Sequence, residues 1–423
     1  MDLTPRPRTR TIGWRGPAAH QEGTIPSSKY LDPLAELLAG HGANVQPGQI
    51  VGISSNPGKE ELTRAIADAA YRRGAKYVDV AYFDPYVKHS RLQHAAEDTL
   101  GWVPPWIGHR MLDLGEMRSA HISLSGPAAP GLMDDIDPGR AGKDRLPQIP
   151  ETLQMIHKGY LNWTVGPGPT PAWAQLVYPD LDPAAAYTRL WEQLGHILRL
   201  DEPDPVVAWR TRSAELIATA KRLTRLRLDA LHFRGPGTDL RVGLLPGSLW
   251  IAAAMTTADG IPFAPNLPSE EVFTTPDPAR TEGHVRATRP LDVAGTVITG
   301  LEARFEGGRI TDIRAAAGGD LLAGRCAMDE GAARLGEVAL VDASGRIGPL
   351  GTVFFDTLLD ENAASHIAVG AAYPDAVAES DQDRMNHSTI HIDFMIGAPD
   401  VDVTGITQDG AEIPVLIAGQ WRM

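Results

Sequence analysis

Residues 49–81 read QIVGISSNPGKEELTRAIADAAYRRGAKYVDVA, and this stretch decides the fold of the N-terminal half. The run 49–55 is short and apolar, as in a buried strand. Apolar residues then recur at helical spacing until Gly74, which stands at a C-cap position, and the run 76–81 is again strand-like. Parallel strands need a helical crossover of this kind. We therefore predict an α/β N-terminal domain with an open, mainly parallel sheet.

A second clear helix signal lies at Asp204-Pro205, where an N-cap residue precedes proline at the first helical position. We expect this helix to bridge two domains, because apolar residues recur on one of its faces. Beyond Leu231 the sequence changes to short β-like runs separated by turn residues. These runs are 239–244, 249–253, 296–305 and 309–314.

The whole chain of 423 residues is longer than one hydrophobic core usually requires, so we predict more than one domain. Residues 1–28 are rich in Arg, Pro, Gly and Thr without apolar periodicity, which indicates a flexible N-terminal arm. Residues 29–231 are predicted to form the α/β domain. Residues 232–423 are predicted to form a β-rich α+β domain that binds metal and is catalytic.

Charge and cysteine content exclude several classes of protein. The 39 Lys and Arg residues are outnumbered by 53 Asp and Glu residues, and a net charge of -14 argues against a nucleic-acid partner. No signal peptide and no apolar run of about 18 residues is visible, so we expect a cytoplasmic protein without a membrane partner. The single cysteine, Cys326, excludes an intramolecular disulfide, and we expect its thiol to be unreactive because no histidine neighbours it in the sequence.

The side chains that carry chemistry lie in the C-terminal half. His391 and Asp393 are separated by one residue, so a strand points both to the same face. Glu337 lies in an apolar run, where an unpaired carboxylate is costly to bury unless a metal neutralises it. Two neighbouring metal ions need a bridging carboxylate and further acidic ligands, which Glu271 and Glu337 can supply. Carboxylates and imidazoles without thiols suit zinc, cobalt or manganese.

Each of these signals has a structural alternative. A histidine in a strand is more often a hydrogen-bonded core or surface residue than a metal ligand, and a glutamate flanked by apolar residues can point outward at a strand edge. The sequence has no H-E-x-x-H motif that would fix two ligands locally, and no G-x-G-x-x-G after the first strand, G-x-S-x-G elbow, P-loop or calcium loop. His387 is interpreted as a residue beside the site or on the surface.

At these residues the chain resembles the thermophilic-type metalloaminopeptidase family that includes aminopeptidase T, aminopeptidase S and PepS. The resemblance extends from about residue 50 to residue 421. Its most specific segments are NWT at 162–164, PTPAW at 169–173, GPGTDL at 235–240, PNLPSEEVFT at 265–274, RLGEVAL at 334–340, DEN at 360–362, HIA at 366–368 and HIDFMIG at 391–397.

The resemblance implies an enzyme that releases N-terminal amino acids from peptide or aminoacyl substrates. It implies two divalent metal ions (zinc, cobalt, manganese or magnesium) that activate water and the scissile carbonyl. It also implies a homodimer whose active sites face an enclosed cavity. Glu271 is preferred to Glu270 because it matches the second glutamate of the family's paired motif. The implied metal ligands are Glu271, Glu337, His366, His391 and Asp393, and Tyr373 is the implied catalytic hydroxyl. We expect Tyr373 to donate to the oxyanion and Glu337, or alternatively Glu271, to orient the water as a catalytic group.

Three other functions remain as alternatives. A mononuclear iron dioxygenase of the ring-cleaving kind could use His366, His391 and Asp393, although Glu271 and Glu337 would have no use in such a site. A narrow biosynthetic amide hydrolase could use the same scaffold and the same metals. A noncatalytic metal-dependent binding protein would keep the ligands without turnover.

Overall fold

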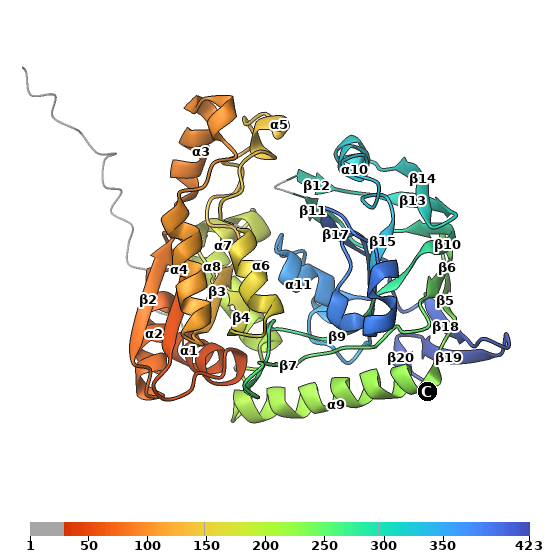
Figure 1. The fold of residues 1–423 in the computed structure, drawn as a ribbon, viewed down its shortest axis with the longest axis horizontal. Helices are drawn as coiled ribbons and strands as arrows, with labels where there is room; N and C mark the ends of the chain where they lie inside the picture. The colour runs from red at the N-terminus through yellow and green to blue at the C-terminus, as the bar shows by residue number, and fades with distance from the viewer. Residues whose placement is uncertain (1–28, 148, 294–295) are drawn as a thin grey trace, which may run out of the picture.

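The computed structural model describes residues 29–147, 149–293 and 296–423 (Figure 1). The predicted N-terminal arm, 1–28, lies outside the described residues. The N-terminal half, on the left of the figure, is an α/β layer, and the C-terminal half, on the right, is rich in strands. The fold class predicted from the sequence is therefore confirmed.

The predicted β-α-β unit consists of β1 (Ile50–Ser55), α2 (Glu60–Arg72) and β2 (Tyr77–Tyr82). The two strands are parallel and fully paired, from Ile50 opposite Tyr77 to Ser55 opposite Tyr82. Gly74 ends the crossover with a φ of +89°, a conformation that residues with a Cβ rarely adopt. The glycine is therefore required by the turn that brings the chain back to the sheet.

The N-terminal sheet has four parallel strands in the order β2-β1-β3-β4, with β3 at Ala120–Ser125 and β4 at Asn162–Pro167. Its order changes direction between β1 and β3, as in open α/β sheets. The remaining helices of this half are α1 (Leu31–Leu37) with a following π-turn (Leu38–Gly42), α3 (Pro85–His94), α4 (Pro105–Glu116), α5 (Pro138–Ala141), α6 (Pro150–His157), α7 (Pro171–Val177) and α8 (Pro183–Ile197).

Helix α9 (Pro205–Leu226) runs along both halves of the molecule (Figure 1). It begins as predicted, because the Asp204 side chain accepts a hydrogen bond from the backbone N–H of Val207. Trp209, near its start, packs into the core of the N-terminal half. Leu216 and Leu223, near its end, pack into the core of the C-terminal half. The helix therefore bridges the two halves, as the sequence predicts.

The C-terminal half contains two antiparallel sheets that pack on a shared hydrophobic core. Phe233 and Val242 of the larger sheet and Val338 and Phe394 of the smaller sheet belong to this core. In spatial order, the larger sheet consists of β14 (Arg309–Arg314), β13 (Glu302–Glu306), β10 (Pro276–Arg286), β6 (Thr238–Leu244), β5 (Ala230–Gly235), β18 (Asp402–Ile406), β19 (Glu412–Ile417) and β20 (Gln420–Trp421), and the smaller sheet of β17 (His391–Met395), β16 (His366–Gly370), β15 (Leu335–Val341) and β9 (Glu271–Thr274).

The short elements of the C-terminal half connect these sheets and lie at their edges. Two small hairpins pair β7 with β8 and β11 with β12. The short strands are β7 (Met255–Thr256), β8 (Pro262–Phe263), β11 (Leu291–Val293) and β12 (Thr296–Ile298), and the helices are α10 (Gly319–Cys326) and α11 (Thr357–Asp360), the latter followed by a 3-10 turn (Glu361–Ala363).

Two strand predictions need correction. The run 249–253 is not a strand, because only Ile251 forms a bridge, to Phe273 of β9. The run 296–305 contains two separate strands, β12 and β13, instead of one. In the second run, Gly300 lies between the two strands with a φ of +61° and interrupts the ladder. The predicted boundary at residues 231 and 232 falls inside β5, and the division into two domains stays a prediction.

Candidate metal centre

The smaller sheet presents one face to the core and the other to the candidate ligands. Along β15, Val338 and Leu340 belong to the core, so Glu337 and Ala339 point to the opposite face. Ala339 pairs with His366 of β16 on one side and with Phe273 of β9 on the other. Because directly paired residues share a face, the alternation along each strand gathers polar side chains on this side.

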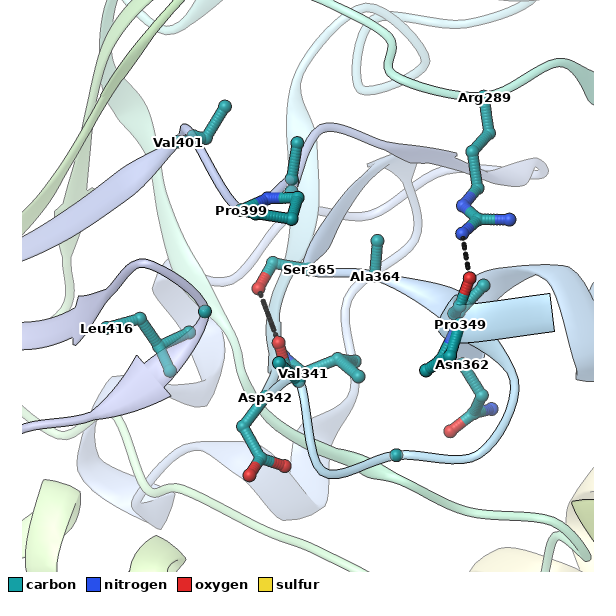
Figure 2. Close-up of a pocket in the computed structure, with 17 residues that line it drawn as sticks. Arg289, Val341, Asp342, Pro349, Asn362, Ala364, Ser365, Pro399, Val401 and Leu416 are labelled. Carbon is teal, nitrogen blue, oxygen red and sulfur yellow. Dashed lines mark hydrogen bonds between the residues drawn. The ribbon is translucent and has the colours of Figure 1, made fainter. Parts of the chain in front are cut away.

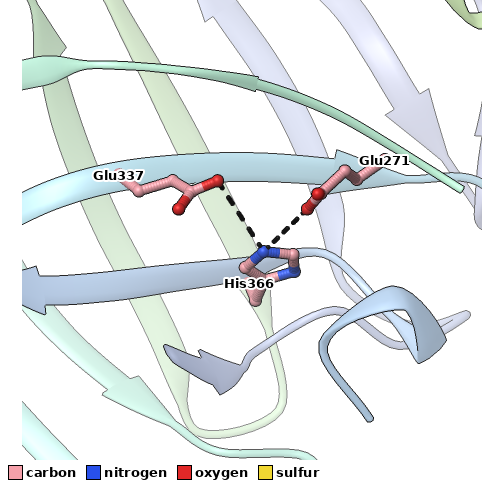
Figure 3. A group of neighbouring side chains, drawn as sticks. All are labelled: Glu271, Glu337 and His366. Carbon is pink, nitrogen blue, oxygen red and sulfur yellow. Dashed lines mark ion pairs between the residues drawn. The ribbon is translucent and has the colours of Figure 1, made fainter. Parts of the chain in front are cut away.

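A first group of possible ligands consists of Glu271, Glu337 and His366, all buried (Figure 3). One donor atom from each lies within 4.8 Å of the others. Nε2 of His366 is 3.0 Å from Oε2 of Glu271 and 4.0 Å from Oε1 of Glu337. A compact set of two carboxylates and one imidazole can hold a divalent metal ion.

A second group consists of Glu337, His391 and Asp393. Nε2 of His391 is 3.1 Å from Oε2 of Glu337 and 3.4 Å from Oδ1 of Asp393. The predicted strand, β17, does place His391 and Asp393 on one face. Glu337 is a member of both groups, so the structure brings together every residue that the sequence analysis named as a ligand.

Both histidines are oriented by the backbone. Nδ1 of His366 lies 3.1 Å from the carbonyl oxygen of Ala364, and Nδ1 of His391 lies 2.8 Å from that of Ala371. A carbonyl oxygen can only accept, so Nδ1 carries a proton in each ring, and Nε2 is the ring atom that faces the carboxylates and could coordinate a metal ion. Metal-binding histidines are commonly fixed in this way.

Glu270 and Glu271 have opposite environments. The Glu270 side chain is 0% exposed and accepts hydrogen bonds from Arg199 Nη2 and Arg212 Nε, each at 2.6 Å. Arg212 also donates to Asp342 at 2.8 Å. Adjacent residues of an extended chain point to opposite sides, so Glu270 is committed to the arginines while Glu271 faces the histidine.

The charges of the candidate ligands lie close enough together to shift one another's pKa values. Burial raises the pKa of the Glu337 carboxyl to about 7, with His391 opposing and the charges of Glu271 and Asp393 adding to the rise. Burial lowers the pKa of His366, but Glu271 and the other carboxylates outweigh it and raise that pKa to about 10. Clustered carboxylates disfavour one another's ionised form, and a bound cation relieves this repulsion.

The buried oxygens fit a metal ion better than they fit the protein alone. Oε2 of Glu271 and Oδ1 of Asp393 are buried and have no hydrogen-bond partner among the described residues. Nε2 of His366 lies 3.0 Å from the first of these oxygens, and Nε2 of His391 lies 3.4 Å from the second. Unsatisfied buried carboxylate oxygens are costly, and coordination of a cation removes the cost. The donor set therefore suits a divalent metal.

Tyr373 lies at the open side of the groups, where 43% of its surface is exposed. Its hydroxyl oxygen is 3.4 Å from Nε2 of His391, and the two rings meet edge to face with centroids 5.0 Å apart. Desolvation of the hydroxyl and the nearby charges of Glu337 and Asp393 raise the pKa of Tyr373 well above its usual value. The phenol therefore stays protonated and can donate a hydrogen bond.

Glu361 is a candidate that the sequence analysis did not select. Burial raises the pKa of its carboxyl well above the usual value, and the charges of Asp393 and Glu271 add to the rise. It lies in the 3-10 turn that leads into β16, five residues before His366. No spacing rule marks such a turn, but the acidic DEN segment was a possible signal.

Two other predicted residues have the roles expected of them. Cys326 is buried, as expected, and burial raises the pKa of its thiol to about 11, which disfavours the thiolate. His387 is exposed and precedes β17, which agrees with a surface position.

A separate cavity of about 200 Å³ is lined in part by residues 362–365 (Figure 2). Arg289, Asp342, Asn362 and Ser365 line part of it, and Arg289 donates a hydrogen bond to the carbonyl of Gly348 at 2.8 Å. The candidate ligands are not among its lining residues. We therefore assign the chemistry to the ligand face of the smaller sheet.

Comparisons with known proteins show which family the chain belongs to. The thermophilic metalloprotease (M29) family matches residues 27–421. The chain is 41% identical to aminopeptidase T of Thermus thermophilus over 93% of its own length and 98% of the relative's. It is 36% identical to aminopeptidase 2 of Geobacillus stearothermophilus, again over 93% of this chain and 98% of the relative.

A solved structure shares the whole architecture. Wild-type AmpT from Thermus thermophilus aligns with a TM-score of 0.87 and 39% identity, covering 93% of this chain and 99% of the other. No helix in the described part of the chain is long and apolar enough to cross a membrane. The predicted family and enzyme class are thereby confirmed: the chain belongs to the M29 family of thermophilic metalloproteases and is a metalloaminopeptidase.

Proposed function

We propose that this enzyme releases N-terminal amino acids from peptides at a site that holds two divalent metal ions. The observation that carries the proposal is the position of Glu337, which is shared by the two ligand groups as a bridging carboxylate would be. Glu271 and His366 would complete one site, and His391 and Asp393 the other. The fixed Nε2 atoms and the unsatisfied carboxylate oxygens support this assignment.

The ions, when bound, supply Lewis-acid activation of a water molecule and of the scissile carbonyl. Glu337 would orient the water, because its carboxylate is buried and belongs to both groups. Tyr373 donates its hydroxyl proton in a hydrogen bond to the carbonyl oxygen as negative charge develops there. Glu361, whose pKa is raised by burial and by the charges of Asp393 and Glu271, is a further acidic group near them.

The identity of the ions and the assembly are parts of the same proposal. Carboxylate and imidazole donors suit zinc, cobalt, manganese or magnesium, and the chain offers no thiolate at the site.

We keep the predictions that the enzyme is a cytoplasmic homodimer and that its two domains divide near residue 231. Sedimentation of the full chain tests the dimer. Glu271 and Glu337 both lie among the candidate ligands. A mononuclear iron dioxygenase would have no use for them, so this alternative is disfavoured.

The experiment that tests the proposal combines activity and metal counting. Chelator-stripped enzyme is assayed on aminoacyl-p-nitroanilides after addition of zinc, cobalt, manganese or magnesium, while bound metal is measured by atomic emission. We expect activity to return only with metal, at about two ions per chain. One tightly bound iron per chain, or no turnover with any metal, would contradict the proposal.

A further inference from the structure

Two aromatic side chains stand beside the ligand groups. Phe273 lies on β9 two residues after Glu271 and pairs with Ala339, which in turn pairs with His366. Phe273 therefore shares the ligand face of the sheet. Its ring meets that of Tyr373 edge to face, with centroids 5.4 Å apart. We call Phe273 and Tyr373 the aromatic wall.

The aromatic wall is accessible, whereas the ligands beside it are buried. Phe273 is partly exposed and Tyr373 is 43% exposed, while Glu271, Glu337 and His366 are buried. Within the described residues after 231, Tyr373 and Met328 are the exposed large hydrophobic side chains. Accessible apolar surface next to a buried polar centre is typical of a pocket for an apolar part of a substrate.

The wall is also held in place by the backbone. Phe273 exchanges two main-chain hydrogen bonds with Ile251, at 2.9 and 3.0 Å. The carbonyl oxygen of Tyr373 accepts a hydrogen bond of 2.8 Å from Oγ1 of Thr275. A surface fixed in this way binds an apolar group without first paying the entropy of ordering itself.

We infer that the aromatic wall receives the side chain of the substrate's N-terminal residue, and that Phe273 sets a preference for large apolar side chains. The inference rests on the proposed function. In an N-terminal residue the side chain is attached to the α-carbon, next to the scissile carbonyl. When that carbonyl lies at the metal ligands, the side chain must therefore lie against a surface beside them. The wall is that surface, since Tyr373 touches His391 and Phe273 touches Tyr373.

The test compares Phe273→Ala and Phe273→Leu with the wild type in the metal-loaded enzyme. Leu-, Met-, Phe-, Ala- and Gly-p-nitroanilides are assayed, and bound metal is counted in each variant. We expect Phe273→Ala to reduce the ratio of kcat/KM for Leu over Ala substrates by about 10- to 100-fold, the range for contacts of an apolar pocket. Phe273→Leu should keep part of the preference, and metal content should not change.

Met117→Ala is a matched control, because Met117 is an exposed hydrophobic residue at the end of α4 in the other half of the chain. It should leave the substrate profile unchanged. An equal loss of kcat/KM for every substrate in both Phe273 variants would overturn the inference and assign Phe273 a purely structural role. Wild-type enzyme that binds two metals but cleaves none of the substrates would instead contradict the proposed function. If Phe273→Ala does not fold, the ratio of kcat/KM for Leu over Ala substrates in Phe273→Leu alone tests the inference.

Discussion

Neighbouring residues can have unrelated tasks, as Glu270 and Glu271 show. Glu270 is enclosed by Arg199 and Arg212, and Glu271 faces His366. We predict that Glu271→Gln lowers metal affinity by about 10- to 100-fold with little effect on the stability of the metal-free chain. Glu270→Gln should instead lower the free energy of unfolding by about 3–5 kcal/mol, because it leaves the buried Arg199 guanidinium without its counter-ion and Arg212 with Asp342 alone.

Isothermal titration with zinc measures the metal affinity of each variant. Urea denaturation of the metal-free variants measures the free energy of unfolding. Each variant is the other's control, since the change is the same and the positions are adjacent. Equal effects of both changes on metal affinity would mean that the division of tasks is wrong.

A second prediction concerns the hydroxyl of Tyr373. Tyr373→Phe removes a donor that matters more in the transition state than in the ground state, so kcat should fall by about 100-fold, while KM and bound metal stay nearly the same. Steady-state kinetics and metal counting on one preparation check this. An unchanged kcat would remove Tyr373 from the mechanism and leave it only as part of the aromatic wall.

A third prediction concerns His121, which is 8% exposed and contacts Ser54 at 3.1 Å. Burial and the charge of Arg110 lower its pKa from 6.5 to about 4. Between these values the unfolded chain binds a proton and the folded chain does not, so stability falls as the pH decreases from 6.5 to 4. A difference of 2.5 pKa units corresponds to about 3 kcal/mol.

Denaturation of chelated protein at pH 4.5 to 7.5 checks this, with His121→Gln expected to show a shallower loss of stability than the wild type. His109→Gln, at an exposed position on α4, is the control and should keep the wild-type slope. Identical slopes for His121→Gln and the wild type would contradict the prediction.

Single residues were predictable from the sequence to different degrees. The pair His391 and Asp393 follows from strand periodicity, because every second residue shares a face. The separation of Glu271 from Glu270 depends on arginines that precede them by many residues in the sequence, so no local pattern reveals it. Glu361 reaches the site through a 3-10 turn, which has no strong sequence period.

Among the structural elements, the segment around α11 connects the two halves. The Lys59 ammonium, which follows β1, is buried and donates to the carbonyl oxygens of Ser125 at 2.7 Å and Gly126 at 2.8 Å. Burial lowers its pKa to about 8, and the charge of Asp356 opposes the shift. Lys59 therefore joins the end of β1 to the end of β3, and its charge acts on Asp356 in the segment that carries Glu361.

We predict that Lys59→Met lowers the free energy of unfolding by about 3–5 kcal/mol, because it leaves these carbonyl oxygens without their donor and removes the positive charge near the buried Asp356. Urea denaturation measures the change. Lys76→Met, at an exposed position beside β2, should alter stability by less than about 0.5 kcal/mol. A loss of stability as small as that of Lys76→Met would show that the buried ammonium is not needed.

Elements with a strong period were predicted best. The crossover from β1 to β2 and the start of α9 follow from helical spacing and from the Asp204-Pro205 cap, and both are confirmed. The run 249–253 failed as a strand because its composition is apolar but its only ladder partner is Phe273. Whether a short apolar run pairs depends on tertiary contacts that the sequence alone does not show.

For the molecule as a whole, metal removal is the most direct test of how the site contributes to stability. A ligand that binds only the folded chain stabilises it by mass action, by about 2.7 kcal/mol at a free concentration 100 times its Kd. We expect chelation to lower Tm and re-addition of zinc or cobalt to restore it. In a variant that carries His366→Ala and His391→Ala, the same additions should leave Tm unchanged; a shift equal to that of the wild type would place the stabilising ions elsewhere.

The core of the N-terminal half contains side chains that come late in the sequence. Phe354 and Leu359 pack into it, and the indole of Trp173 donates to the carbonyl oxygen of Phe354 at 2.6 Å. During synthesis, the residues of the parallel sheet leave the ribosome long before these partners exist. The nascent chain must therefore hold an incomplete core, with apolar surface open to chaperones, until most of the catalytic half has been translated.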